Sequence, residues 1–315
     1  MVASPMANQR VRVVVTCTHR KRRPTPDALR LRQISGAHIS TRFRAWTDRL
    51  MKSSEPVSQA IDLYAGEYWS IVRRLSNTVI PVETWICSAG YGLISSDSPI
   101  RPYSATFATG SPDSIPDGSR GASSWWKALS DWVGPSPGPR SITDLVMADP
   151  EARIILVLSA AYLKACRQDI VQALNQIHQD GQLSIISAGT KEDPQLAPYL
   201  LPGDARFQSA LGGTRQTLNI RAAQYLLATG VIKHDEMVAT LARLLVDQPS
   251  ITRYKRRTAT DAEVRTFIQD RLKTDPGATH TRLLRQFRDD DRACEQNRFT
   301  ALFHIEARTR KGAAR

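Results

Sequence analysis

Short apolar runs rich in β-branched residues recur through the first two thirds of the chain. They occupy residues 11–16, 82–87, 153–159 and 183–187. Runs of this length with little charge are typical of strands that are buried on both faces, as in a parallel sheet. Each run stops at small or polar residues, as at Thr16-Cys17. The pattern therefore predicts buried parallel strands whose carboxyl ends meet at one edge of a sheet.

Segments with helical spacing separate these runs. Apolar residues three and four positions apart predict helices at residues 56–76, 160–179 and 218–230, and shorter helices at 125–132 and 141–148. A further apolar run predicts a last strand at residues 207–211. Alternating strands and helices predict an α/β fold, a three-layer sandwich in which helices cover both faces of a parallel sheet.

The character of the chain changes after Gly230. The remaining periodic segments are all helical, and they occupy residues 234–245, 261–273, 280–288 and 295–305. Three short helices with tight turns and many arginines favour a helix-turn-helix-like DNA-binding module, with Gln296, Asn297 and Arg298 facing a groove. A helical cap that completes the main core is the alternative. We therefore expect an α/β domain at residues 10–230 and an all-α module at residues 231–315.

Charge is distributed unevenly along the chain, whose net charge is +13. Residues 1–52 carry 12 Lys or Arg against 2 Asp or Glu, residues 251–315 carry 16 against 9, and the middle is net −4. Two basic ends around a slightly acidic body suit a polyanion, so we expect nucleic acid as the partner, with solvated surface charge as the alternative. The residues expected to contact DNA are Arg20, Lys21, Arg22, Arg221, Arg256, Arg257, Arg285 and Arg298.

Four cysteines are present, none of them in a C-x-x-C pair, and no histidines cluster at zinc-ligand spacing. We expect no metal, no cofactor and no disulfide framework. No apolar run approaches the ~20 residues of a membrane span, and residues 1–10 lack the apolar core of a signal peptide. These features predict a cytoplasmic chain with no membrane partner, and they leave its oligomeric state open.

Residues 85–107 form the stretch around which we expect the functional site. The strand ends in Ser88-Ala89-Gly90-Tyr91-Gly92, and two polar turns then lead to Pro102-Tyr103. Small residues at the carboxyl edge of a sheet let a ligand approach backbone N–H groups. We expect this edge to form a pocket with the end of the first strand. The candidate substrate-binding residues are Cys17, Tyr64, Ser88, Gly90, Tyr91, Tyr103 and Asn219.

Several of these pieces carry a resemblance. They are Cys17-Thr18-His19-Arg20-Lys21, Asp62-Leu63-Tyr64-Ala65-Gly66, Ser88-Ala89-Gly90-Tyr91-Gly92-Leu93 and Ile100-Arg101-Pro102-Tyr103. Over residues 10–230 the chain resembles an uncharacterised bacterial family that is itself similar to the YaaA peroxide-stress proteins and to the C-terminal part of archaeosine synthase. The resemblance implies the fold of uracil-DNA glycosylases. Some proteins of this group are anti-phage glycosylases that excise glucosylated hydroxymethylcytosine.

The C-terminal pieces at residues 283–285 and 293–299 resemble helical modules appended to related proteins. The chain departs from uracil glycosylases in one respect that matters for catalysis. Its first strand ends in Cys17-Thr18-His19-Arg20-Lys21 and lacks the water-activating aspartate of a Gln-Asp-Pro-Tyr loop, and no late His-Pro-Ser follows. If the protein cleaves a glycosidic bond, its catalytic carboxylate lies at a different position in the sequence from that of uracil glycosylases.

Hydrolysis of an N-glycosidic bond needs a group that positions water or stabilises the sugar cation, a donor to the leaving base, and a pocket for the flipped base. The candidate carboxylates are Asp97 and Asp62, followed by Asp113 and Glu67; a turn-capping or surface role is the alternative for each. His19 is the candidate donor, or else a polar loop residue.

The leading interpretation is a DNA glycosylase that produces abasic sites in modified phage DNA. A 7-deazaguanine-type remodelling enzyme with a nucleophilic Cys17 is one rival. A non-catalytic sensor of modified DNA is the other. The sequence names neither the base nor the strandedness of the nucleic acid.

Overall fold

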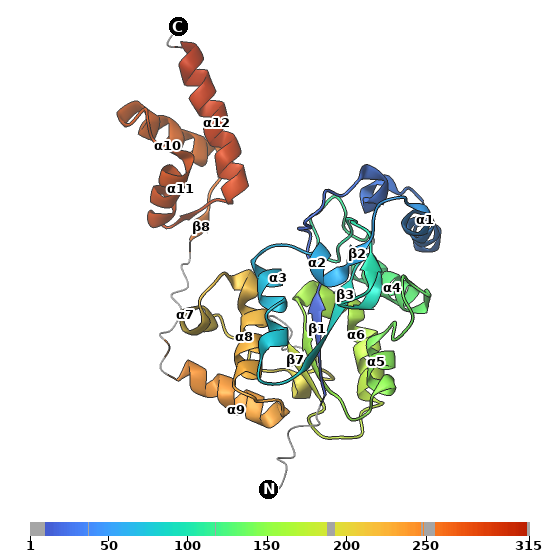
Figure 1. Ribbon diagram of the computed structural model, residues 1–315. Coiled ribbons are helices and arrows are strands. Elements are labelled where there is room, and N and C mark those ends of the chain that lie inside the picture. The colour runs from blue at the N-terminus through green and yellow to red at the C-terminus, as the bar shows by residue number, and fades with distance from the viewer. Residues whose placement is uncertain are drawn as a thin grey trace. The chain divides into compact units, whose positions relative to one another are not determined.

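The computed structural model describes residues 10–36, 38–116, 118–187, 193–246, 248 and 256–313. The chain divides into two compact units, residues 1–249 and 250–315, and Figure 1 shows their elements. Residues 188–190, which follow the predicted strand at 183–187, and residues 254–255 of the basic C-terminal segment lie outside the described residues.

The centre of the first unit is a five-stranded sheet in the order β4-β3-β1-β6-β7. Its strands are β1 (Val11–Thr16), β3 (Val82–Ser88), β4 (Gly92–Ser95), β6 (Arg153–Val157) and β7 (Leu183–Ile186). Only the β3–β4 pair is antiparallel among these neighbours. Every residue of β1, β6 and β7 is buried, which is why these strands appear in the sequence as nearly uncharged runs. The mainly parallel α/β sheet is thus confirmed, with an antiparallel edge strand added.

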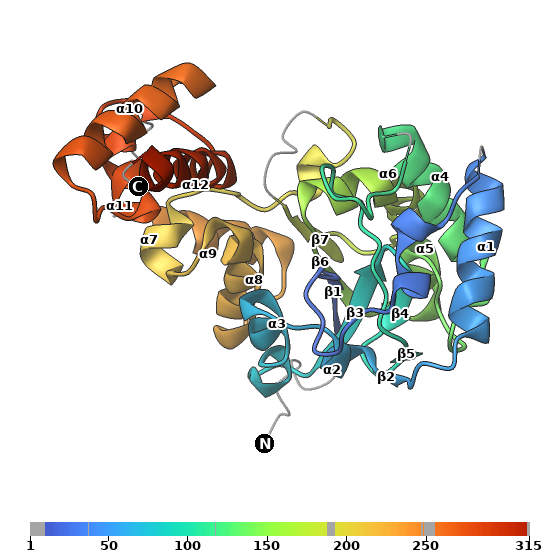
Figure 2. The same cartoon turned by 90° about the horizontal axis from the view of Figure 1, so that it is seen from above.

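Helices cover both faces of this sheet, as Figures 1 and 2 show. One layer contains α4 (Gly118–Asp131), α5 (Ile142–Ala148) and α6 (Ala160–Leu174), with α1 (Ile39–Lys52) packed against α4. The other layer contains α3 (Glu67–Val72), α8 (Leu218–Ala228) and α9 (His234–Leu245). The small ribbon of β2 (Ser58–Gln59) and β5 (Pro99–Ile100) lies beside α2 (Ala60–Leu63).

Two predicted elements were wrong. The single helix expected at residues 56–76 is broken into α2 and α3, because Tyr64 pairs with Lys21 in a β-bridge and Gly66 has a φ of +98°, which helical residues do not adopt. The last strand expected at residues 207–211 is a short helix, α7 (Phe207–Leu211). Its apolar run buries only Phe207, so it lacks the two-sided burial of the real strands.

The domain boundary lies later than predicted. Helix α9 packs against α7 and α8, and its buried residues Met237, Leu241 and Leu245 belong to the core of the first unit. Residues 231–245 are therefore part of the α/β unit rather than of the C-terminal module.

The second unit has its own apolar core, built around Phe267, Phe287 and Phe299. Its helices are α10 (Asp261–Thr274), α11 (His280–Asp289) and α12 (Gln296–Ala313), joined by a two-residue ribbon of β8 (Arg257–Thr258) and β9 (Arg292–Ala293) that the sequence pattern did not reveal. Thr260 caps the start of α10, because its hydroxyl accepts from Glu263 N while the Glu263 carboxylate accepts from Thr260 N.

Candidate active site

Hydroxyl groups gather below the carboxyl ends of β1 and β3. The Tyr103 hydroxyl lies 2.9 Å from that of Tyr64 and 2.7 Å from that of Ser88, and Ser88 Oγ also accepts from the N–H of Gly90 and of Tyr91. Tyr64, Ser88 and Tyr103 are fully buried. They were predicted to bind a substrate directly, but their burial makes them the floor beneath a site. Burial also raises the pKa of Tyr103 well above its ordinary value.

Gly90 belongs to this floor for a steric reason. A Cβ atom at this position would lie 2.5 Å from two ring atoms of Tyr103. The Gly90 carbonyl accepts from Trp46 Nε1 at 2.8 Å. Tyr91, only 3% exposed, packs edge-on against the Tyr103 ring. Gly90 and Tyr91 therefore fix the position of Tyr103 and are covered by protein themselves, which corrects the prediction that they face a substrate.

Lys21 turns inward above this floor. Its ammonium donates to the Thr18 carbonyl at 2.7 Å and lies 4.3 Å from the centroid of the Tyr103 ring and 5.6 Å from that of Tyr64. Burial lowers the pKa of Lys21 to about 8, because desolvation outweighs the opposite effects of Cys17 and Asp113. Lys21 was predicted to bind a DNA phosphate, but its ammonium group contacts the Thr18 carbonyl and the two tyrosine rings.

Cys17 closes one side of the cluster. Its backbone N–H donates to the Cys87 carbonyl at 3.0 Å, which continues the β1–β3 pairing beyond the strand. Its Sγ lies 3.0 Å from the hydroxyl of Tyr162 in the first turns of α6, and Cys17 is 7% exposed. The thiol is thus shielded and already partnered.

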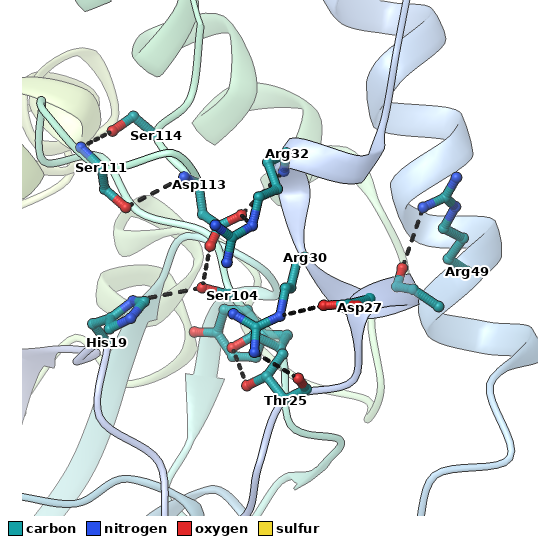
Figure 3. A network of polar contacts seen from close by, with 12 residues as sticks. His19, Thr25, Asp27, Arg30, Arg32, Arg49, Ser104, Ser111, Asp113 and Ser114 are labelled. Carbon is teal, nitrogen blue, oxygen red and sulfur yellow. Dashed lines mark hydrogen bonds and ion pairs between the residues drawn. The ribbon is translucent and has the colours of Figure 1, made fainter.

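Figure 3 shows a network of polar contacts that links His19, Ser104, Asp113 and Arg32. Asp113 is 1% exposed, and its carboxylate accepts from Ser104 Oγ at 2.8 Å and from the backbone N–H of Arg32 at 3.1 Å. The Arg32 guanidinium lies 3.4 Å from the same carboxylate. Ser104 Oγ also lies 3.5 Å from Nδ1 of His19, which is exposed. Asp113, Ser104 and His19 therefore form one relay that ends at the surface.

The direction of these bonds sets the tautomer of His19. Since Ser104 gives its only hydroxyl proton to Asp113, its oxygen can only accept from the histidine. The contact therefore favours the neutral tautomer with the proton on Nδ1, in which Nε2 keeps its lone pair. A water molecule or a ligand at the surface would meet a basic nitrogen.

The relay depends on pairing between distant segments. Ser104 pairs with Arg30 and Thr106 pairs with Ser114 in isolated β-bridges, and Ser111 Oγ accepts from Asp113 N. Arg30 in turn donates to the Thr25 carbonyl and pairs with Asp27 (Figure 3). These contacts bring the loop after β1 and the loop after β5 together above the sheet.

The other predicted carboxylates do not join this cluster. Asp97 was expected to face the pocket, but the antiparallel β4 returns the chain toward the amino end of β3, where Ser96 N donates to the Thr84 carbonyl. Asp97 is exposed there and lines a surface pocket that also contains Arg73 and Glu83. Asp62 is an exposed residue of α2.

In the helical layer that contains α8, two residues that were predicted to contact a ligand bind other parts of the protein instead. Arg221 is 2.7 Å from Glu67 and also donates to the Leu211 carbonyl, so both members of this ion pair are engaged. Asn219 donates to the Leu158 carbonyl just beyond β6. These contacts join α8 to α3, α7 and the sheet.

The remaining predicted DNA contacts fall into two groups. Arg257 pairs with Glu263 at 2.5 Å and Arg298 pairs with Asp261 at 2.6 Å, so part of their charge is neutralised. Arg20, Arg22 and Arg285 make no side-chain hydrogen bond or ion pair with any described residue. Arg285 and Arg256 line a pocket of about 330 Å³ in the second unit, together with His280, Thr281, Leu284, Arg288, Asp289 and Gln296.

Sequence reasoning missed Ser104, Arg32 and Tyr162, and it ranked Asp113 below Asp97. The small residues Ser104 and Ala105 after Tyr103 were a local signal, but they do not reveal that His19, 85 residues away, is the partner of Ser104. Comparisons of the chain with protein-family models, with curated proteins and with solved structures found no match.

Within the described residues, no three or more His, Cys, Asp or Glu side chains are grouped so that they could hold a metal ion. No helix in the described part of the chain is long and apolar enough to cross a membrane.

Proposed function

We propose that the first unit is a DNA glycosylase with a uracil-DNA-glycosylase-like fold, and that it removes a modified base from phage DNA. The observation that supports this proposal is the exposed His19, whose ring is oriented by the buried Asp113 through Ser104 at the carboxyl edge of the sheet. Ligands of open α/β sheets bind at this edge. Glucosylated hydroxymethylcytosine is the candidate base.

In this proposal His19 Nε2 takes a proton from the attacking water while the bond between sugar and base breaks. General bases of this kind typically accelerate a reaction by about 10²–10⁴-fold. Asp113 is too deeply buried to touch a substrate, so it acts as a positioning residue. The second unit supplies DNA affinity through its arginines.

The test compares DNA from a phage that carries glucosylated hydroxymethylcytosine with DNA that lacks the modification. After incubation with the full chain, alkali or an abasic-site endonuclease would reveal excised bases as strand breaks. We expect breaks in the modified DNA only, and a loss of about 10²-fold or more in the initial rate for His19→Gln. His38→Gln is the matched control, because His38 is also an exposed histidine of the first unit and lies outside the relay.

Two other outcomes would each replace the proposal. Loss of activity in Cys17→Ala with full activity in His19→Gln would favour the base-remodelling enzyme, for which the proximity of Lys21 to Cys17 is the supporting observation. Tight binding of modified DNA without any product would favour the non-catalytic sensor.

A further inference from the structure

The proposed mechanism leaves Lys21 without a task. It is a half-buried lysine on the loop that also carries His19. Its amine lies above the Tyr103 ring, while the His19 ring contacts the next residue, Ser104. Lys21 and His19 therefore approach the same short segment from the same loop.

The surroundings of Lys21 keep its amine reactive. The rings of Tyr64 and Tyr103 form an aromatic wall, and the nearby titratable groups are Cys17 and Asp113. Asp113 is engaged by Ser104 and by Arg32, so no carboxylate forms a direct ion pair with Lys21 among the described residues. With a pKa of about 8 rather than 10.5, a much larger fraction of the amine is neutral at neutral pH than for an ordinary lysine.

We propose that Lys21 is a nucleophile that forms an imine with the aldehyde of an abasic deoxyribose, and that it thereby cleaves the DNA strand at the site where a base has been removed. This inference rests on the proposed function, because the abasic site is the product of base excision. A desolvated lysine beside an apolar wall is the usual form of such a nucleophile.

The chemistry balances without an external oxidant or reductant. The Lys21 amine adds to C1′ of the ring-opened sugar, and the hydroxyl of the carbinolamine leaves as water to give the protonated imine. His19 Nε2 then removes a proton from C2′, the electron pair forms a C2′–C3′ double bond, and the 3′ phosphate leaves with the C3′–O electrons. Water finally hydrolyses the imine and releases Lys21.

The experiment uses the full chain and an oligonucleotide with a preformed abasic site, so that it does not depend on base excision. Borohydride reduces an imine to a stable adduct, which is measured on a denaturing gel, and mass spectrometry of peptides then assigns the modified residue. We expect an adduct at Lys21 whose rate of formation rises with pH and levels off above about 8. In Lys21→Arg, which keeps a cation over the aromatic rings, we expect at least a 100-fold loss.

Lys52→Arg is the matched control, because the Lys52 side chain is 81% exposed, and it should trap as well as the wild type. Thermal unfolding of Lys21→Arg would verify that the variant is folded. An adduct on another amine, or equal trapping by Lys21→Arg, overturns the inference.

Failure of this inference can be distinguished from failure of the proposed function. Excision of the modified base without any adduct at Lys21 would leave the glycosylase in place and refute the imine step. An adduct at Lys21 without excision from modified DNA would support the nucleophile and refute the glycosylase.

Discussion

Replacing Asp113 by asparagine tests the relay, because the change keeps the size of the side chain and removes its charge. In the wild type, the Asp113 carboxylate accepts from Arg32 N–H through Oδ1 and from Ser104 Oγ through Oδ2. The backbone N–H of Arg32 can only donate, so the oxygen of the new amide must face Arg32. The amide NH₂ group then faces Ser104 and donates to it.

The reversed hydrogen bond between residue 113 and Ser104 changes the bond between Ser104 and His19. Once Ser104 Oγ accepts from the new amide, its hydroxyl proton is free to point at His19 Nδ1. The histidine proton must then move to Nε2. Asp113→Asn is therefore expected to remove the basic nitrogen from the surface while leaving the His19 ring in place.

The magnitude follows from the bonds that change. A hydrogen bond to a charged group contributes about 1.5–3 kcal/mol and a neutral one about 1 kcal/mol. The preference of the Ser104 proton for Asp113 is therefore about 1 kcal/mol or more, which is about a fivefold bias toward the Nδ1–H tautomer. The ion pair with Arg32 adds little, because the Arg32 side chain is 39% exposed. We expect Asp113→Asn to lower the free energy of unfolding by about 1–2 kcal/mol.

The assay is ¹⁵N NMR of the imidazole nitrogens above the pKa of histidine, with the His19 signals assigned from His19→Gln. Urea denaturation would measure the change in unfolding free energy. Asp97→Asn is the control, because Asp97 is an exposed carboxylate whose contacts are within its own turn. If His19 shows the same tautomer in the wild type and in Asp113→Asn, the relay does not set the ring proton and the reasoning is refuted.

Two further predictions concern packing and DNA affinity. Gly90→Ala should lower the free energy of unfolding by about 1–3 kcal/mol, since its Cβ would overlap the Tyr103 ring. Gly277→Ala, which has no positive φ and whose Cβ would meet only Asp275 Oδ1 at 3.7 Å, should cost its own unit less, and equal losses in urea denaturation would contradict this. Arg285→Ala should reduce the salt dependence of DNA binding by about one phosphate contact. Arg298→Ala should reduce it less because Asp261 already pairs with Arg298; the reverse order in binding titrations would be inconsistent with this account.

The strands show why part of the fold could be predicted from local patterns. β1 and β6 are buried along their whole length, so apolar residues on both faces leave a short, nearly uncharged run that is recognisable in the sequence. The N-cap at Thr260 has the same local character, since its partner Glu263 is three residues away. Such features depend on neighbours in the chain.

Asp97 and Asp113 show what local sequence patterns cannot predict. Asp97 and Asp113 both lie in polar turns rich in serine and proline, and nothing near either one distinguishes them. The antiparallel β4 carries Asp97 away from the carboxyl edge. The bridge between Thr106 and Ser114, together with Arg32 and Ser104, buries Asp113 beside that edge.

The sequence by itself determined the mainly parallel α/β sheet, the helices on both of its faces and the helical character of the C-terminal segment, because burial and capping leave periodic or adjacent signals. Only the tertiary structure decided that α9 belongs to the first unit, that Tyr64 and Tyr103 lie in the floor, and that His19, Ser104 and Asp113 form one relay. Those contacts join residues that are far apart in the chain, and the free energy that selects them comes from burial and hydrogen bonding between segments, which no local pattern records.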